Sequence, residues 1–191
     1  MKNTIRTFVA VEINASVRAR ADAMMRQLAA VAAGIKWVEA HNLHFSLKFL
    51  GDVPLVETPK ICKAVEAAAA TIEPFELDVQ GAGAFPHSGQ PRTLWLGAGA
   101  GGEQLVALAE AIEAALKKLG YPPEGRPFQP HLTIGRVRQG DRVPAEFGKL
   151  IQEQAEKSFG QTTVDEVVVF SSRLDRAGPT YEALGHAPLG G

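Results

Sequence analysis

Two segments of the chain repeat the same order of residue types: His44-Phe45-Ser46-Leu47 and His131-Leu132-Thr133-Ile134. Both tetrads read histidine, apolar, hydroxyl, apolar. Successive side chains of an extended strand point to opposite faces, so each tetrad places an imidazole and a hydroxyl on one face and two apolar side chains on the other. A histidine with an ordinary pKa near 6.5 can give or accept a proton at neutral pH. The repeated tetrad therefore predicts acid–base chemistry on a phosphate.

Two such tetrads suit a displacement at phosphorus. The nucleophile and the leaving group lie on opposite sides of the phosphorus atom, so one histidine can accept a proton while the other donates one. We therefore expect His44 and His131 to be the catalytic pair. The hydroxyls of Ser46 and Thr133 lie two residues further on, and we expect them to bind the non-bridging phosphate oxygens.

Three basic residues near the tetrads are further candidates for phosphate binding. Arg136 offers a planar, permanently charged fork of donors that matches phosphate oxygens. Lys48 has the same strand parity as His44, so we expect it to add a second positive charge, less specifically. Arg92 follows a predicted loop over Gly83–Pro91, and it either lines the cleft or is solvated.

Hydrophobic periodicity predicts both strands and helices along the whole chain. Strands are predicted over Thr4–Glu12, Ile35–Val38, Leu43–Leu50, Phe75–Val79, Thr93–Gly97, His131–Val137, Thr162–Leu174 and Tyr181–Leu184. Helices are predicted over Ser16–Ala33, Pro59–Thr71, Gly101–Leu119 and Pro144–Lys157. The order strand, helix, tetrad strand, helix occurs once in each half. We expect an α+β fold, one domain over residues 1–191, with two pseudo-symmetric lobes, each an antiparallel sheet backed by helices, around a central cleft.

Composition excludes several classes of function. The 191 residues carry a net charge of −1, which argues against a non-specific nucleic-acid coat. Cys62 is the one cysteine, so no internal disulfide forms. The first apolar run is too short for a signal peptide or a membrane span. We expect a cytoplasmic monomer that binds no membrane and has no obligate protein partner.

The sequence around the tetrads resembles that of the 2H phosphoesterase superfamily, which is named for two such motifs. Within it, the chain is similar to the bacterial and archaeal RNA 2′,3′-cyclic phosphodiesterases, also called 2′-5′ RNA ligases. Further shared segments are Arg6–Val11, Lys36–Val38, Leu47–Gly51, Pro91–Gly97, Phe128–His131 and Ser172–Leu174. The resemblance implies metal-independent hydrolysis of a 2′,3′-cyclic phosphate, on an RNA 3′ end or a nucleotide, to a 2′-phosphate, with reversible 2′-5′ ligation as a second activity.

The resemblance also implies roles for individual residues. It favours His44 as the acid that protonates the leaving O3′ and His131 as the base that activates water. It implies that Arg136 contacts the phosphate and that Phe49 stacks on the terminal base. Both lie five residues after a histidine, so a regular strand would point them away from the cleft. We expect a bulge or twist near Gly51 or Gly135 to re-aim them.

Other functions stay open at this point. A metal hydrolase would use the histidines as ligands, but the chain has no HExxH motif, no cysteine pair and no acidic cluster near either tetrad, so we expect no metal and no cofactor. A non-catalytic RNA-end-binding protein would not need two titratable groups. A related phosphodiesterase could act on 2′-5′ oligonucleotides or another cyclic nucleotide. His41, His87 and His186 lie outside the pattern and are expected to be structural.

Overall fold

The computed structural model describes residues 3–87, 90–176 and 178–190, which form one sheet and the helices that pack on it. The strands are β1 (Thr4–Glu12), β2 (Ile35–Trp37), β3 (His44–Pro54), β4 (Phe75–Phe85), β5 (Thr93–Ala98), β6 (His131–Val137), β7 (Ser158–Val164), β8 (Glu166–Leu174) and β9 (Pro179–Pro188). The helices are α1 (Ala15–Ala29), α2 (Thr58–Ala69), α3 (Gly102–Lys117) and α4 (Ala145–Glu153), with short 3-10 turns at Ala40–Asn42 and Leu55–Glu57. Among these residues no helix has the length and apolar character needed to span a membrane.

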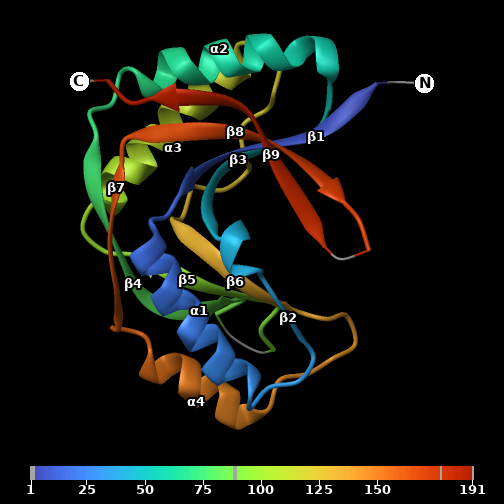
Figure 1. Cartoon of the computed structure of the whole chain (residues 1–191), viewed down its shortest axis with the longest axis vertical. Helices are drawn as coiled ribbons and strands as arrows, with labels where there is room; N and C mark the ends of the chain where they lie inside the picture. The colour runs from blue at the N-terminus through green and yellow to red at the C-terminus, as the bar shows by residue number, and fades with distance from the viewer. Residues whose placement is uncertain (1–2, 88–89, 177, 191) are drawn as a thin grey trace.

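The sheet is antiparallel throughout and has the strand order β7-β4-β5-β6-β3-β1-β8-β9, with β2 paired to β6 (Figure 1). Apart from β2, the sheet consists of two groups of four strands, and the described residues join these groups through the pairing of Phe45 in β3 with Leu132 in β6. Four helices accompany these strands. The predicted α+β class with two sheet-based lobes is therefore confirmed.

The two halves repeat the same connection order around that pairing. β1, α1, β3 and α2 in the first half correspond to β5, α3, β6 and α4 in the second. Ala10 of β1 lies opposite Ser46, just as Trp95 of β5 lies opposite Thr133. The strands that follow are exchanged, because β4 joins β5 of the second half and β8 joins β1 of the first. This confirms the predicted internal repeat.

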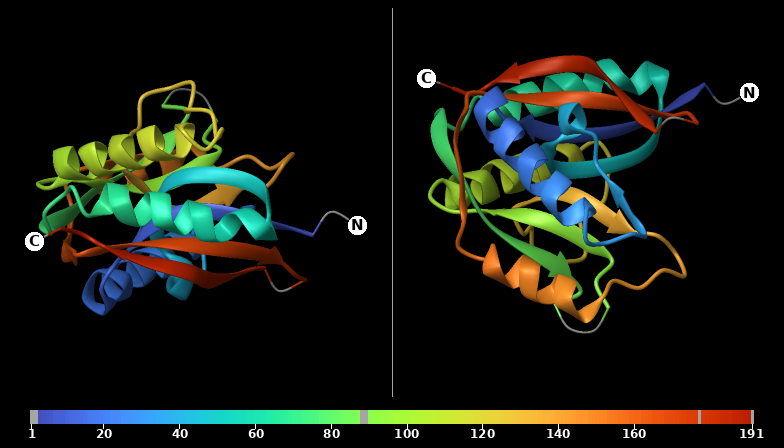
Figure 2. Two further views of the ribbon diagram at one scale, coloured as in Figure 1. Left: turned by 90° about the horizontal axis from the view of Figure 1, so that it is seen from above. Right: turned by 60° about the horizontal axis from the view of Figure 1, so that its bottom comes forward.

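The helices cover the sheet in the way their apolar faces require. α2 and α3 lie side by side, and α2 also contacts β9 (Figures 1 and 2). α1 packs on β7, and the Asn14 side chain caps its first turn by accepting a hydrogen bond of 2.9 Å from the Val17 amide. The apolar members of both tetrads are buried in the core, as the alternation predicted: Phe45, Leu47, Leu132 and Ile134.

Each tetrad strand contains a bulge at the same point. Relative to β1, Leu47 is an extra residue of β3, and relative to β5, Ile134 is an extra residue of β6. In each strand two successive residues are buried at the bulge. Beyond the bulge, the positions that regular alternation would bury are therefore exposed, and the reverse. Phe49 and Arg136 consequently lie on the exposed face with the histidines, as expected for a strand re-aimed by a bulge.

The bulge in β3 also overturns one prediction. Lys48 does not share the face of His44; it is turned to the opposite side and its side chain is only 4% exposed. Its Nζ donates to Glu113 Oε1 on α3 at 2.9 Å and to the Pro122 carbonyl at 2.7 Å. Regular alternation predicted the wrong face because it could not account for the extra residue.

This buried ion pair holds the loop of residues 118–130, which leads into β6. Glu113 Oε1 also accepts a hydrogen bond of 2.7 Å from the Glu124 amide. Burial alone would raise the pKa of the Glu113 carboxyl, but the hydrogen bonds from Lys48 and the Glu124 amide lower it overall. A second contact comes from Tyr121, whose hydroxyl donates to Glu57 at 2.7 Å. The loop is thus fixed at several points.

Two further expectations need correction. The predicted strand Thr162–Leu174 is two strands that separate at Asp165, with β7 paired to β4 and β8 paired to β1 at the other end of the sheet. A continuous run of β-forming residues does not reveal where the chain leaves one neighbouring strand and pairs with another. β4 continues to Phe85 into the segment predicted as a loop over Gly83–Pro91, of which Ser88 and Gly89 lie outside the described residues. The predicted pairing of the C-terminal strand is confirmed by β8 and β9.

The two ends of the ion pair should respond unequally to substitution. Glu113→Leu leaves the Lys48 ammonium buried without a counter-charge, so we expect it to lower the free energy of unfolding by about 3–5 kcal/mol. Lys48→Met leaves a carboxylate that is 30% exposed and can hydrate, so its cost should be smaller. Urea denaturation of both variants measures this difference. Equal losses would show that the burial of Lys48 does not determine the energetics of the pair.

Candidate active site

The contact between β3 and β6 brings the two tetrads together. Because Phe45 lies opposite Leu132 in an antiparallel pair, the first residue of each tetrad lies opposite the third residue of the other. Directly opposite side chains have Cβ atoms about 4.5–5.5 Å apart, and diagonal neighbours have Cα atoms about 7–8 Å apart. The partly buried polar side chains gathered on this face are His44, Ser46, His131 and Thr133.

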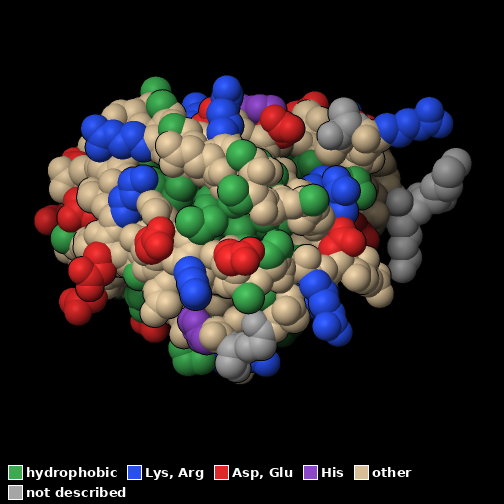
Figure 3. Space-filling view, turned by 90° about the horizontal axis from the view of Figure 1, so that it is seen from below, with side chains coloured by type: hydrophobic (Ala, Val, Ile, Leu, Met, Phe, Trp, Pro, Cys, Tyr) green, Lys and Arg blue, Asp and Glu red, His purple; other side chains and the backbone are tan. Residues whose placement is uncertain are grey.

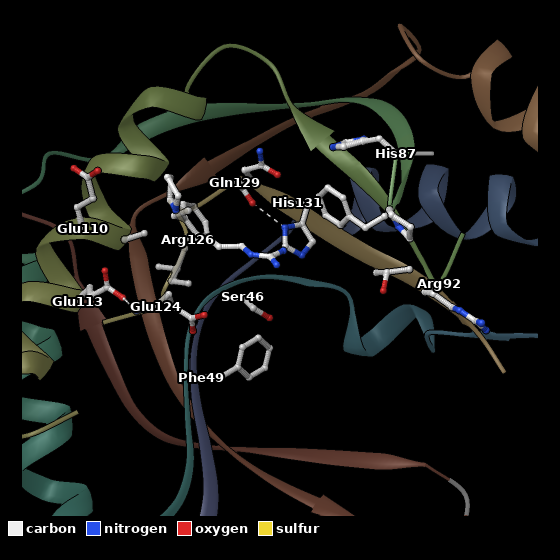
Figure 4. A pocket seen from close by; sticks show the side chains of 17 residues that line it. Ser46, Phe49, His87, Arg92, Glu110, Glu113, Glu124, Arg126, Gln129 and His131 are labelled. Carbon is white, nitrogen blue, oxygen red and sulfur yellow. Dashed lines mark hydrogen bonds between the residues drawn. The ribbon is translucent and has the colours of Figure 1, made fainter. Parts of the chain in front are cut away.

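Both histidines are oriented by the same backbone contact. Nδ1 of His44 lies 2.7 Å from the Asn42 carbonyl oxygen, and Nδ1 of His131 lies 2.7 Å from that of Gln129. A carbonyl only accepts, so each Nδ1 must carry a proton, which leaves Nε2 of the neutral ring unprotonated. Nε2 of His44 lies 2.9 Å from Ser46 Oγ, which donates to it. Figure 4 shows the contact of His131 with Gln129. Each half of the molecule thus presents one Nε2 for proton transfer.

The two histidines lie in different surroundings. His44 packs among aromatic rings: Phe8 is stacked on it at 5.0 Å between centroids, Tyr181 meets it edge-on at 5.4 Å, and Phe170 lies at 6.5 Å. Burial lowers the pKa of His44 to about 4, although the hydrogen bond to the Asn42 carbonyl acts in the opposite direction. The neutral imidazole is therefore the form that this packing favours.

A cleft of about 870 Å³ opens on the His131 side of the tetrads. Ser46, His131 and the 56% exposed ring of Phe49 line it (Figure 4). Phe85 meets His131 edge-on at 5.3 Å and forms part of the same wall. Its size falls within the range of pockets that enclose a small ligand, about 300–1,000 Å³. The cleft is therefore large enough to enclose a small organic ligand beside the tetrads.

Arg136 lies at the opposite end of the site. It is exposed on the histidine face of β6, and its Nη1 donates to Thr93 Oγ1 at 3.3 Å. Its guanidinium and that of Arg6 lie close enough to Tyr181 to act against the burial that raises the pKa of that phenol. Arg136 and the Phe49 cleft thus flank the tetrads from opposite ends.

Sequence reasoning missed several residues of the site. Phe8 reaches His44 through the pairing of β1 with β3, and Tyr181 reaches it through the pairings of β9 with β8 and of β8 with β1. Arg126 lines the cleft from the 118–130 loop, where no periodicity marks it. Arg92 also lines the cleft, but Figure 4 shows its side chain pointing away from His131.

The remaining histidines do not join the tetrads. His87 lines the rim of the cleft edge-on to Phe85, and His186 lies exposed, 3.2 Å from Glu166. Within the described parts of the chain, no three or more His, Cys, Asp or Glu side chains are grouped so that they could hold a metal ion.

Comparison with known proteins agrees with this arrangement. The model of the 2′-5′ RNA ligase superfamily matches residues 14–176. The chain is 36% identical over 180 residues to an RNA 2′,3′-cyclic phosphodiesterase of Archaeoglobus fulgidus, covering 94% of this chain and 98% of that protein. A protein of the same name from Aquifex aeolicus is 30% identical over 188 residues, covering 98% of both chains.

Solved structures show the same fold. A protein of Thermus thermophilus superposes with a TM-score of 0.82 at 30% identity, covering 98% of this chain and 99% of that one. E. coli LigT in complex with 3′-AMP superposes with a TM-score of 0.72 at 25% identity, covering 97% and 98%. The arrangement of strands around the cleft is thus shared with both.

The aromatic packing of His44 should make folding stability depend on pH. The unfolded chain binds a proton at the ordinary histidine pKa near 6.5, whereas folded His44 does so only near 4. Stability should therefore fall as the pH is lowered, by about 2 kcal/mol between pH 7 and pH 5 from this group. Urea denaturation at both values, compared with His44→Gln, isolates the contribution. The idea fails if the variant loses as much stability as the wild type over this interval.

Proposed function

The chain belongs to the 2′-5′ RNA ligase superfamily, and from this premise we propose that it hydrolyses the 2′,3′-cyclic phosphate of an RNA 3′ end or nucleotide to a 2′-phosphate. The observation that carries the proposal is the convergence of the two tetrad histidines on one polar face. Each has its Nδ1 bound to a carbonyl, so each would transfer a proton through Nε2, with one ring neutral to accept it and the other protonated to donate it.

The geometry supports an in-line displacement. One imidazole takes a proton from water as the oxygen attacks phosphorus, and the other gives a proton to O3′ as the P–O3′ bond breaks. Thr133 would donate to the non-bridging oxygens, whose negative charge rises in the transition state, and Ser46 would do the same once its hydroxyl turns from His44 Nε2, to which it donates at 2.9 Å. Arg136 would stabilise the same oxygens from the far end, and Phe49 would hold the base by stacking.

The pKa of His44 constrains the assignment of roles. The family resemblance favours His44 as the acid, but a group with a pKa of about 4 carries almost no proton at neutral pH. For that role, the bound phosphate must raise the pKa of His44, because a nearby negative charge favours the imidazolium. If His44 stays neutral in the complex, it is the base and His131 is the acid.

The superfamily name also supports a second candidate activity. Joining of RNA ends through a 2′-5′ linkage would use the same displacement with a ribose 5′ hydroxyl in place of water, so that the P–O5′ bond forms as the P–O3′ bond breaks. In the reverse reaction O3′ would attack phosphorus and O5′ would leave. The same pair of histidines would serve both directions. A cytoplasmic location, a monomeric state and the absence of an obligate protein partner stay predictions from the sequence.

Loss of either histidine should abolish most of the activity. We expect His44→Ala and His131→Ala each to lower turnover of a 2′,3′-cyclic phosphate about 10²–10⁴-fold, and the double variant to lose much less than the product of the two. The assay uses oligoribonucleotides ending in 2′,3′-cyclic phosphate, with EDTA present. Activity lost to the chelator and restored by Zn²⁺ would contradict the acid–base proposal, as would full activity of either variant.

Substrate binding should be linked to proton uptake if His44 is the acid. The inactive His131→Gln variant binds a nucleoside 2′,3′-cyclic phosphate, an anion that does not itself titrate near neutrality. Calorimetry at pH 6 in two buffers of different ionisation enthalpy measures the protons taken up. We expect uptake in this variant and none when His44 is also replaced by Gln. Binding without uptake would assign His44 as the base.

A further inference from the structure

Arg126 is a positively charged group in the cleft for which the catalytic scheme has no use. It lies in the 118–130 loop and lines the same cleft as Ser46, Phe49 and His131. Figure 4 shows its side chain reaching from the loop into the cleft toward His131, whereas Arg92 points away. No hydrogen bond or ion pair connects the Arg126 side chain to another described residue. Its five donors are therefore free for a ligand.

The loop holds Arg126 in a defined place. Lys48, buried behind the tetrad strand, binds the loop carbonyl of Pro122, and Glu113 binds the amide of Glu124, two residues before Arg126. A substrate-binding group carried on such a fixed segment loses little conformational freedom when it binds. The buried ion pair thus links the catalytic strand β3 directly to the loop that carries Arg126.

Neighbouring carboxylates do not neutralise Arg126. Glu113 lines the cleft too, but its carboxylate is paired with Lys48 at 2.9 Å. Glu110 points away from His131, and Glu124 lies toward the Phe49 end (Figure 4). The positive charge of Arg126 is therefore concentrated on the His131 side of the cleft, where a second anionic group of the substrate can meet it.

In the proposed scheme, Arg136 binds the reacting phosphate from the end of the site opposite Phe49. A nucleoside that stacks on Phe49 with its cyclic phosphate over the tetrads fills the space between these two residues. The next anionic group of an RNA end is the phosphodiester that joins the last two nucleotides. On the face shown in Figure 3, basic and acidic side chains alternate around a central hydrophobic group. No broad basic surface is visible on that face.

We propose that Arg126 binds the phosphodiester joining the last two nucleotides, so that the enzyme acts on a polynucleotide end in preference to a free nucleoside 2′,3′-cyclic phosphate. This inference rests on the proposed function and adds a substrate class to it. Arg126 is a substrate-binding residue in this scheme, and Lys48 and Glu113 are positioning residues. A guanidinium suits this role because it can form two parallel hydrogen bonds to a phosphate.

The test compares two substrates that differ in one charge. Both are uridine dinucleotides ending in a 2′,3′-cyclic phosphate; one has the normal diester linkage and the other a neutral methylphosphonate linkage. The wild type should prefer the diester by about 10- to 100-fold in kcat/KM, the value of a hydrogen bond to a charged group. Arg126→Gln should lose this preference and hydrolyse the methylphosphonate substrate at nearly the wild-type rate. Arg92→Gln, on the same cleft, is the matched control and should keep the preference.

Several results would overturn the assignment. Equal loss of activity on both substrates in Arg126→Gln would mean that Arg126 contacts the base or the reacting phosphate. An unchanged preference in that variant would mean that Arg126 does not contact the linkage between the two nucleotides. Loss of the preference in Arg92→Gln as well would mean that the general field of the cleft selects the diester.

Failure of the proposed function can be told apart from failure of this inference. If the wild type hydrolyses neither substrate, calorimetric binding of the same two dinucleotides is measured on wild type and Arg126→Gln. A diester preference in binding that is lost in the variant supports the phosphodiester contact without any catalysis. Equal affinity of the wild type for both linkages overturns it.

Discussion

Phe45 and Leu132 lie opposite each other where β3 meets β6, and the position of each polar group on these two strands follows from its distance to that pairing. In each strand, the residue before the paired apolar residue is the histidine and the residue after it carries the hydroxyl. The extra residue that follows in each strand then turns Phe49 and Arg136 onto the same face and sends Lys48 into the core. Both apolar side chains of the pairing are fully buried, so neither can slip without exposing the core.

The repeat produces equivalent backbones but not equivalent histidines. Each imidazole is oriented by a carbonyl two residues earlier, yet His44 is enclosed by aromatic rings from β1, β8 and β9, whereas His131 faces an open cleft. Catalysis of one displacement needs a donor and an acceptor, which two identical environments would not distinguish. The difference in packing therefore supplies an asymmetry that the duplicated motif by itself lacks.

Alternation in the tetrads was sufficient to predict the four central polar residues, the apolar residues behind them and the α+β class. It was insufficient beyond the fourth residue, because a bulge leaves no clear trace in sequence and reverses the parity that placed Lys48. The position of Arg136 and Phe49 on the histidine face was predicted only because a bulge was anticipated near glycine, and their roles stay predictions. Arg126 and Tyr181 depend on tertiary contacts, through a loop and through strands more than a hundred residues apart, and periodicity carries no information on either.

The exchange of strands between the halves has a consequence for how the protein is made. β1 leaves the ribosome long before β8, which is one of its two neighbours in the sheet, and β4 leaves before both of its neighbours, β5 and β7. Neither half can complete its own sheet from its own residues. During synthesis one edge of β1 therefore stays unpaired until β8 has been made, and one edge of β4 stays unpaired until β7 has been made, so completion of the sheet depends on long-range pairing.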